Sequence, residues 1–369
     1  MERGEGNSSV LQGPNCTHSE EYKFTTYTVV FSLVFIFGLL VNVGALYVFC
    51  KLSVKNRLST IFLIHLAVSD LIFILTLPLR IAFYFSDSTG MQESLPSSTM
   101  LHLTLACRFS TFMFYISMYC SIFFLTALSM CRYLVLAGRI RLQNSEACKW
   151  AHFLCWGIWV FVVGGNILYL AITSGFSMRA EGCLEPTGKD SWALLYHLNL
   201  VVLVICFLLP LTVVLICYSL MIRHILRIRA GQRQRDVALI CLVLLIFCLC
   251  FLPYHIQRTL HLHYMMHQHT ATCQLLATLQ KSVVVTLCFA AVNSCLDPLL
   301  FLFVGHGFKA VINKFIAHVH LSCALENTSL SSTAPAVVQL PLVGEPNTTD
   351  RDQASSRELP LSQKSDTDV

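Results

Sequence analysis

Charged residues are scarce in this sequence. Asp, Glu, Lys and Arg make up only 12% of its 369 residues, while 55% are hydrophobic. A soluble domain carries about 25% charged residues. Glycine (17) and proline (11) are also too few for a collagen-like or proline-rich chain. The shortage of charge excludes an ordinary soluble domain and predicts an integral membrane protein.

The few charges leave apolar runs long enough to cross a bilayer, which takes about 20 residues in a helix. Five uncharged runs cover residues 24–50, 109–131, 150–178, 191–222 and 237–257, and two more, at 60–85 and 275–303, contain charges. Continuous apolar runs favour helices over the alternating strands of an outer-membrane barrel. The sequence therefore predicts an all-α membrane protein. We expect a bundle of seven transmembrane helices within residues 24–304 and a short interfacial eighth helix at 305–318.

The basic residues predict the orientation of these spans. If residues 1–23 form an extracellular tail, most loop lysines and arginines fall on the cytoplasmic side, as the positive-inside rule requires. Glycosylation acceptor motifs at Asn7 and Asn15 lie in that tail. The densest basic segment, residues 223–235, falls between the fifth and sixth spans, where it faces anionic lipid or a cytosolic protein. No folded soluble module surrounds it, which argues against nucleic acid as a partner.

Seventeen cysteines are present, and most lie within the apolar runs, where a thiol behaves as a small apolar residue. Four fall at predicted extracellular positions: Cys16, Cys107, Cys183 and Cys273. Four cysteines in an oxidising compartment predict two disulfides, and three pairings remain open. Cys323, which follows the predicted eighth helix, is a candidate for palmitoylation.

Histidines gather at the predicted outer end of the sixth span, at His261, His263, His267 and His269. Such a group could bind zinc, but a solvated histidine-rich loop is the interpretation favoured by the sequence alone. The sequence predicts no cofactor, and no metal other than a sodium ion whose site lies on the second, third and seventh spans.

Polar side chains inside a membrane are costly and are usually functional. Four oxygen-bearing side chains lie on the second, third and seventh spans: Asp70, Ser121, Asn293 and Asp297. Two nearby carboxylates repel each other, and a bound cation such as sodium relieves that repulsion. The alternative is a hydrogen-bonded polar core in which one carboxylate is protonated.

Cations also occur in the outer halves of the spans, without matching acids. Together with nearby tyrosine hydroxyls they predict a pocket for an anion. The candidate ligand-binding residues are Arg80, Tyr115, Tyr119, His255, Arg258 and Lys281. Snorkelling of the cations to the membrane interface is the alternative, and we favour the ligand role for Arg80 and Arg258.

Several motifs in the spans are shared with a known family. They are Leu66-Ala67-Val68-Ser69-Asp70, Arg132-Tyr133, Phe247-Cys248-Leu249-Cys250-Phe251-Leu252-Pro253 and Asp297-Pro298-Leu299-Leu300-Phe301, with Asn42, Trp159, Pro210 and Tyr218. Residues 24–318 therefore resemble the class A (rhodopsin-like) G-protein-coupled receptors. The resemblance implies an activation switch formed by Arg132, Tyr133, Tyr218, Phe247, Phe251, Pro253, Pro298 and Phe301.

The resemblance also implies a heterotrimeric G protein as the cytosolic partner. In the mechanism we expect, an agonist favours a state in which the sixth span, hinged near Pro253, swings outward at its cytoplasmic end. The G protein then enters a crevice with Arg132 at its base. Sodium leaving the site between Asp70 and Asp297 would favour the same state.

Within that class the chain is most similar to the cysteinyl leukotriene receptors, and more to type 1. The similar segments are residues 77–80, 119–124, 252–263 and 280–287. This resemblance implies the disulfides Cys107–Cys183 and Cys16–Cys273. It implies a ligand with carboxylates and a long lipid chain, and coupling to Gq-class G proteins that raises cytosolic calcium.

Three positions depart from the family pattern. Cys131 precedes Arg132, where an acid is common, and Phe301 replaces the usual tyrosine of the seventh-span motif. Phe251 stands where a tryptophan is frequent. We therefore expect basal activity and switching that differ from the family norm.

After residue 318 the composition changes to Ser, Thr, Pro and acidic residues, which predicts a disordered cytoplasmic tail over 319–369. Phosphorylation there would add charge and recruit an arrestin. The final Thr367-Asp368-Val369 resembles a PDZ ligand, in which a terminal carboxylate and an apolar side chain fit strand addition.

Other functions fit this sequence less well. A nucleotide or a dicarboxylate is the alternative ligand, because the same cations suit phosphate. A secondary transporter typically shows internal repeats, and we find none in the sequence. An enzyme would need a nucleophile with a positioned base, and no such group of residues lies at a common depth, so we expect no catalytic activity.

Overall fold

The computed structural model describes residues 21–51, 58–88, 96–140, 145–174, 189–225, 230–267 and 272–300. These residues contain seven helical spans long and apolar enough to cross a membrane, which confirms the predicted seven-helix bundle. The predicted eighth helix at 305–318 lies outside the described residues.

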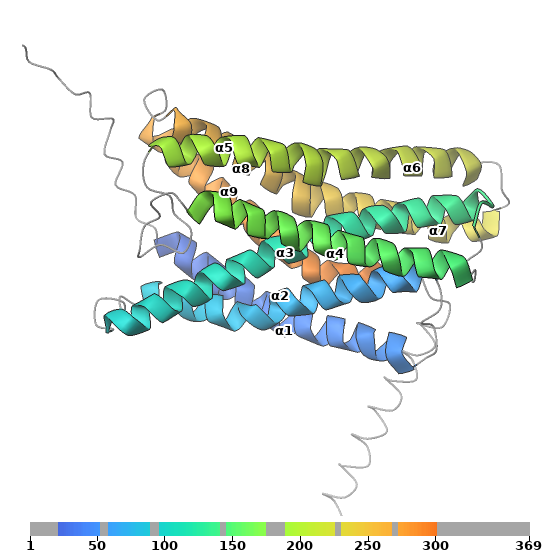
Figure 1. Cartoon of the computed structure of the whole chain (residues 1–369), viewed down its shortest axis with the longest axis horizontal. Helices are drawn as coiled ribbons and strands as arrows, with labels where there is room; N and C mark the ends of the chain where they lie inside the picture. Colours follow the sequence, from blue (N-terminus) through green and yellow to red (C-terminus); the bar gives the residue numbers. More distant parts are fainter. Residues whose placement is uncertain are drawn as a thin grey trace, which may run out of the picture. The chain divides into compact units, whose positions relative to one another are not determined.

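The first four spans are single helices, namely α1 (Glu21–Lys51), α2 (Leu58–Ser88), α3 (Ser97–Leu136) and α4 (Ser145–Ser174) (Figure 1). The fifth consists of α5 (Lys189–Val202), the π-helical segment η2 (Leu203–Leu208) and α6 (Leu209–Ile225). The sixth consists of α7 (Ala230–Ile246), the π-helical segment η3 (Phe247–Phe251) and α8 (Leu252–Met266). The seventh is α9 (Cys273–Leu296), which ends in the 3₁₀ turn η5 (Asp297–Leu299). All seven are helical because a bilayer offers the backbone no water to bond.

Prolines explain where the fifth and sixth spans change helical type. Proline lacks an N–H, and its ring clashes with the carbonyl four residues earlier. For Pro210 and Pro253 that carbonyl belongs to Cys206 in η2 and to Leu249 in η3. The wider turns of these two segments accommodate the ring. Both spans therefore carry a built-in irregularity next to a proline, halfway along their length.

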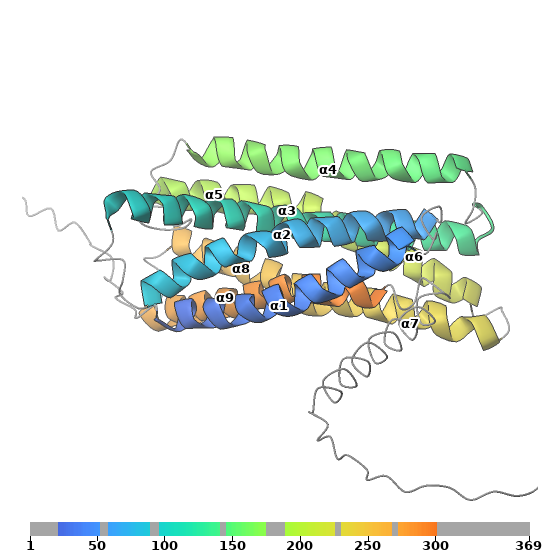
Figure 2. The same cartoon turned by 90° about the horizontal axis from the view of Figure 1, so that it is seen from below.

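α3 is the central helix of the bundle and α4 a peripheral one. In the most apolar window of each helix, 72% of the residues are buried in α3 and 17% in α4. Figure 2 shows α4 at one edge of the bundle. Large side chains such as Trp150, Phe153 and Trp156 remain exposed there, as expected where a helix faces lipid tails. The side chains of α3, in contrast, take part in sites with several neighbouring helices.

Buried polar side chains connect the helices. Asn42 on α1 donates from Nδ2 to the carbonyl of Ser294 on α9 at 2.7 Å and to that of Gly38 at 3.0 Å. On α4, Trp159 donates from Nε1 to Nδ1 of His65 on α2 at 3.2 Å. A buried polar group without a partner is costly, so these bonds help to fix which helices lie together.

Candidate ligand-binding site

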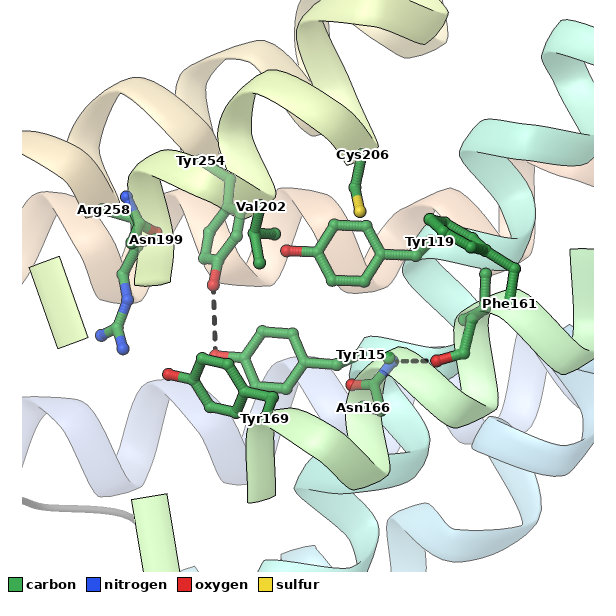
Figure 3. A pocket seen from close by; sticks show the side chains of 12 residues that line it. Tyr115, Tyr119, Phe161, Asn166, Tyr169, Asn199, Val202, Cys206, Tyr254 and Arg258 are labelled. Atoms are coloured by element: carbon green, nitrogen blue, oxygen red, sulfur yellow. Dashed lines mark hydrogen bonds between the residues drawn. The ribbon is translucent and has the colours of Figure 1, made fainter. Parts of the chain in front are cut away.

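A pocket lies among α3, α4, the fifth span and α8 (Figure 3). Its empty volume is ≈ 700 Å³, which includes the space at its open side. The lining residues are Tyr115, Tyr119, Phe161, Val162, Gly165, Asn166, Tyr169, Asn199, Val202, Cys206, Tyr254 and Arg258. A small organic ligand therefore fits among these four spans.

One end of the pocket is polar. The Arg258 guanidinium lies there with the hydroxyls of Tyr115, Tyr169 and Tyr254 (Figure 3). Tyr254 donates its hydroxyl hydrogen to the Tyr115 oxygen at 3.1 Å, so the Tyr115 hydroxyl can in turn donate to a ligand. No lining residue is acidic, and the charge of Arg258 is not neutralised by the pocket itself. An anionic group is the ligand chemistry that these donors favour.

The other end of the pocket is apolar. Phe161 and Cys206 lie on this side, and the ring of Tyr119 runs beside them with its hydroxyl directed toward the polar end, while Val202 lies between Tyr119 and Tyr254 (Figure 3). The Phe161 ring packs edge-on against Phe123 at a centroid distance of 5.4 Å. The pocket thus joins a cationic end to an apolar one, which suits an amphipathic anion.

Hydrogen bonds connect the polar end to the sixth span. Asn199 on α5 donates from Nδ2 to Oγ1 of Thr259 on α8 at 2.9 Å. Thr259 Oγ1 in turn donates to the His255 carbonyl at 2.8 Å. Because Asn199 lines the pocket, a ligand that contacts its side chain also acts on the packing of α5 against α8.

Three of the six predicted ligand residues line this pocket, namely Tyr115, Tyr119 and Arg258. His255 is not among the lining residues. It is buried, with its ring stacked on Phe207 at 4.3 Å and centred 6.1 Å from Tyr119. His255 therefore lies where it supports the Tyr119 ring from behind.

The other two predicted ligand residues, Arg80 and Lys281, do not line the pocket either. Lys281 is exposed on α9, with its Nζ 5.3 Å from the centroid of the Tyr22 ring. Arg80 on α2 is buried and 3% exposed, so it does not snorkel to an interface. Its guanidinium carbon lies 4.7–5.8 Å from the centroids of four rings, which belong to Tyr27, Phe31, Tyr84 and Phe114.

Sequence reasoning missed much of the lining. Asn166 and Tyr169 lie three residues apart on α4, and Asn199 and Tyr254 come from α5 and α8. Side chains three apart share a helix face, so the Asn166–Tyr169 spacing in an otherwise apolar span is the signal that could have identified α4 as part of the site. Cys206 gave no such signal because the spans contain many cysteines.

The four residues of the predicted sodium site come together in the structure, joined by a fifth. Asp70 Oδ1 accepts hydrogen bonds from Ser117 at 3.2 Å and from Ser121 at 3.5 Å. Asn293 donates from Nδ2 to Asp297 Oδ2 at 2.9 Å. All five side chains are buried. Ser117, missed by sequence reasoning, lies one turn before Ser121 on the same face of α3.

The free oxygens of this cluster fit a hard cation. Asp70 Oδ2, Asp297 Oδ1 and Asn293 Oδ1 are buried and have no hydrogen-bond partner. Carboxylate, amide and hydroxyl oxygens are the ligands of hard cations. Within the described ranges, no three His, Cys, Asp or Glu side chains form a group that could hold a metal. The oxygen cluster therefore suits a single monovalent cation better than a transition metal.

Comparison with known proteins places this chain in a family. Residues 41–301 match the family described as 7 transmembrane receptor (rhodopsin family). The chain belongs to this receptor family. Its relatives are receptors, not enzymes, and membership with seven spans makes it a multi-pass plasma membrane protein with G proteins as partners. The predicted resemblance to class A receptors is confirmed.

Individual relatives cover most of the receptor. The Sus scrofa cysteinyl leukotriene receptor 2 is 35% identical over 301 residues, 80% of this chain and 82% of the relative. The Homo sapiens cysteinyl leukotriene receptor 1 is 32% identical over 322 residues, 85% and 91% of the two chains. The Homo sapiens lysophosphatidic acid receptor 6 is 31% identical over 303 residues, 79% and 84%. The similarity to cysteinyl leukotriene receptors is confirmed, and the two types match at nearly equal identity.

Seven of the eight predicted switch residues fall within the described ranges, on α3, the fifth and sixth spans and η5. Tyr218 on α6 accepts a hydrogen bond from Ser129 Oγ on α3 at 2.7 Å. In η3, the rings of Phe247 and Phe251 pack edge to face at 5.6 Å, and both are buried. The wide π-helical turn that precedes Pro253 thus carries two buried aromatic rings that pack against each other.

One departure from the family pattern has a structural counterpart. Cys131 Sγ on α3 lies 3.9 Å from Ser59 Oγ on α2, within reach of a weak sulfur hydrogen bond. The next residues, Arg132 and Tyr133, are partly buried at the end of α3. The contact that an acid commonly makes with Arg132 is therefore replaced by a contact between α3 and α2. Phe301 lies outside the described residues.

Several predictions concern segments beyond the described ranges. Cys107 and Cys273 are each disulfide-bonded, but their predicted partners Cys183 and Cys16 fall outside those ranges, so the two pairings stay predictions. The same holds for glycosylation at Asn7 and Asn15 and palmitoylation at Cys323, for the PDZ ligand ending in Val369, and for the extracellular position of the N-terminus.

Proposed function

We propose that this receptor responds to an anionic lipid mediator of the cysteinyl leukotriene class. The observation that carries the proposal is the division of the pocket into a cationic end at Arg258 and an apolar end at Phe161 and Cys206. A ligand with a carboxylate and a long hydrocarbon chain satisfies both ends at once. A nucleotide or a small dicarboxylate would leave the apolar end unfilled.

The names of the relatives support the same ligand class. Both types of cysteinyl leukotriene receptor match this chain, as does a receptor named for lysophosphatidic acid, which is also an anionic lipid. The common chemistry of these ligands is an acidic group joined to an aliphatic chain. Arg258 would bind the acidic group with the tyrosine hydroxyls as further donors, and the apolar end would take part of the chain.

Ligand binding would shift the receptor between two states. The bound acid contacts Arg258 and the Tyr254 hydroxyl on α8, and the Asn199–Thr259 bond relays its position to the packing of α5 on α8. The wide turn of η3 next to Pro253 serves as the hinge at which the inner half of the sixth span moves outward. A Gq-class G protein then binds, with Arg132 at the base of its crevice, and cytosolic calcium rises.

The oxygen cluster would hold sodium in the inactive state. Asp70, Ser121, Asn293 and Asp297 are the proposed ligands, with Ser117 orienting Asp70. The bound cation reduces the repulsion between two buried carboxylates, so sodium favours the state in which these side chains lie close together. By linkage, an agonist that favours the other state lowers the affinity for sodium.

The test is calcium flux in cells that express this chain, challenged with leukotriene D4, lysophosphatidic acid, ADP and UDP. We expect a response to leukotriene D4. Substitution Arg258→Ala removes a charge-assisted hydrogen bond worth about 1.5–3 kcal/mol, which corresponds to about a 10- to 150-fold loss of agonist potency. Tyr119→Phe keeps the ring and removes only the hydroxyl, so its loss is smaller.

Lys23→Ala is the matched control, because it removes a cation from the outer end of α1, away from the pocket lining. It should leave potency unchanged at equal surface expression. A response to ADP or UDP in the absence of a response to leukotriene D4 would refute the ligand class. Unchanged potency in Arg258→Ala would refute the pocket.

A further inference from the structure

The last turn of α8 places two histidines on one face of the helix. His263 and His267 are four residues apart, and residues at this spacing are neighbours on a helix surface. Their ring centroids are 4.8 Å apart, and the ring planes are inclined by 42°. Both side chains are partly exposed, so an ion can reach them from solvent. Two histidines at this spacing are the arrangement with which helical zinc motifs begin.

The distance between the rings fits a shared metal ion. Zinc binds an imidazole nitrogen at about 2.0–2.1 Å, which puts the metal about 3.2 Å from the ring centre. Two rings bound to one zinc at a near-tetrahedral angle therefore have centroids about 5 Å apart. The observed 4.8 Å is close to this distance.

Hydrogen bonding and packing orient the pair. The Nδ1 atom of His267 lies 3.0 Å from the His263 carbonyl oxygen. When Nδ1 carries the proton and donates it to this carbonyl, Nε2 has the lone pair that a metal needs, and metal-binding histidines are commonly held by such a second hydrogen bond. On the other side, the Tyr196 ring of α5 packs against the His263 ring at 5.6 Å. The two rings are thus supported from α8 itself and from the fifth span.

We propose that His263 and His267 form a zinc-binding site at the end of the sixth span. Imidazole ligands suit zinc and do not suit magnesium or calcium. α8 contains no acidic residue, so the binding energy comes from the two imidazoles, with water in the remaining coordination positions. The site is separate from the pocket, since neither histidine is among the lining residues. It bears on the same span, and zinc bound there is linked to the position of α8 against α5.

The test uses the full-length receptor, purified in lipid nanodiscs without ligand. Thermal unfolding is followed by tryptophan fluorescence while ZnCl₂ is titrated, with MgCl₂ at equal concentrations as the ion control. We expect zinc to raise the apparent melting temperature and magnesium to leave it unchanged. His263→Ala and His267→Gln should each raise the zinc concentration for the half-maximal effect by about tenfold or more, the range seen when support of a metal site is lost.

His197→Ala is the matched histidine control. It removes an exposed histidine next to Tyr196 on α5 that lies outside the pair, and it should keep the zinc response of the parent. The proposal is wrong if both pair variants keep that response, because zinc would then bind elsewhere, for example at cysteine thiols. It is also wrong if magnesium gives an equal shift. If His263→Ala does not fold, His267→Gln at the helix end decides the question, with its calcium response in zinc-free buffer as the check on folding.

Discussion

Replacing Arg80 with methionine should stabilise the empty receptor. Arg80 is buried at 3% exposure on α2, and no acidic side chain forms an ion pair with it among the described residues. Nη2 donates to the Tyr84 hydroxyl at a long 3.5 Å. Nε and Nη1 are buried and have no hydrogen-bond partner. Methionine keeps the flexible apolar stem that packs against the surrounding rings and removes the charge.

The magnitude follows from the contacts of the guanidinium. Two buried donor groups without acceptors cost about 1–3 kcal/mol each. The rings of Phe31 at 4.7 Å and of Tyr27, Tyr84 and Phe114 at 5.7–5.8 Å return about 1–2 kcal/mol through cation–π attraction at a desolvated site. The long hydrogen bond adds less than about 1 kcal/mol. Taking the middle of each range, we expect Arg80→Met to raise the free energy of unfolding by about 2 kcal/mol.

The assay compares the apparent melting temperatures of the purified parent and Arg80→Met receptors without ligand, under identical detergent and lipid conditions. The same two chains are then compared in calcium flux. Because Arg80 does not line the pocket, potency should fall less in Arg80→Met than in Arg258→Ala. A lower melting temperature for Arg80→Met would refute the reasoning, since it would show that the aromatic cage more than offsets the burial of the charge.

Three further outcomes are expected. A Cβ at Gly38 would lie 2.8 Å from a side-chain atom of the buried Ile74, so Gly38→Ala should lower the free energy of unfolding by about 1–3 kcal/mol. A Cβ at Gly157 would meet open space, so Gly157→Ala should raise it by up to about 1 kcal/mol. Thermal unfolding of both variants is the check. Tyr218→Phe loses the bond from Ser129 and should cost about 0.5–1.5 kcal/mol, and a double-mutant cycle with Ser129→Ala should be non-additive. In the parent, NaCl should reduce agonist affinity relative to KCl, and Asp70→Asn should abolish that difference; a difference that persists in Asp70→Asn contradicts the sodium site.

The number and type of spans could be predicted because a chain that crosses a bilayer must satisfy its backbone hydrogen bonds internally, and a long apolar run does so as a helix. Each uncharged run had to become a helix, and each did over the residues that the structure describes. The ends were less predictable, as α3 shows. It begins at Ser97, although the uncharged run begins only at residue 109, because a helix extends beyond the membrane wherever its residues favour helix. Arg108 interrupts the apolar run without interrupting the helix.

The lining of the pocket was less predictable than the bundle. In a span that is apolar all round, the sequence does not show which face meets another helix and which meets lipid. Tyr115, Tyr119 and Arg258 could be predicted because polar groups stand out in apolar spans. Val202 and Cys206 could not, because only the three-dimensional arrangement distinguishes them from the many other apolar residues and cysteines of the spans.

Arg80 and Arg258 show why a cation in a membrane span does not reveal its role by type alone. Both lie in the outer half of a span, and both lack an acidic partner among the described residues. Arg80 is buried beside four ring faces, which stabilise a cation, and it does not line the pocket. Arg258 is bordered by tyrosine hydroxyls in a pocket with an open side, where an incoming carboxylate meets both a positive charge and donors. The ring faces and hydroxyls around each guanidinium, not its charge, decide which of the two can take up an anion.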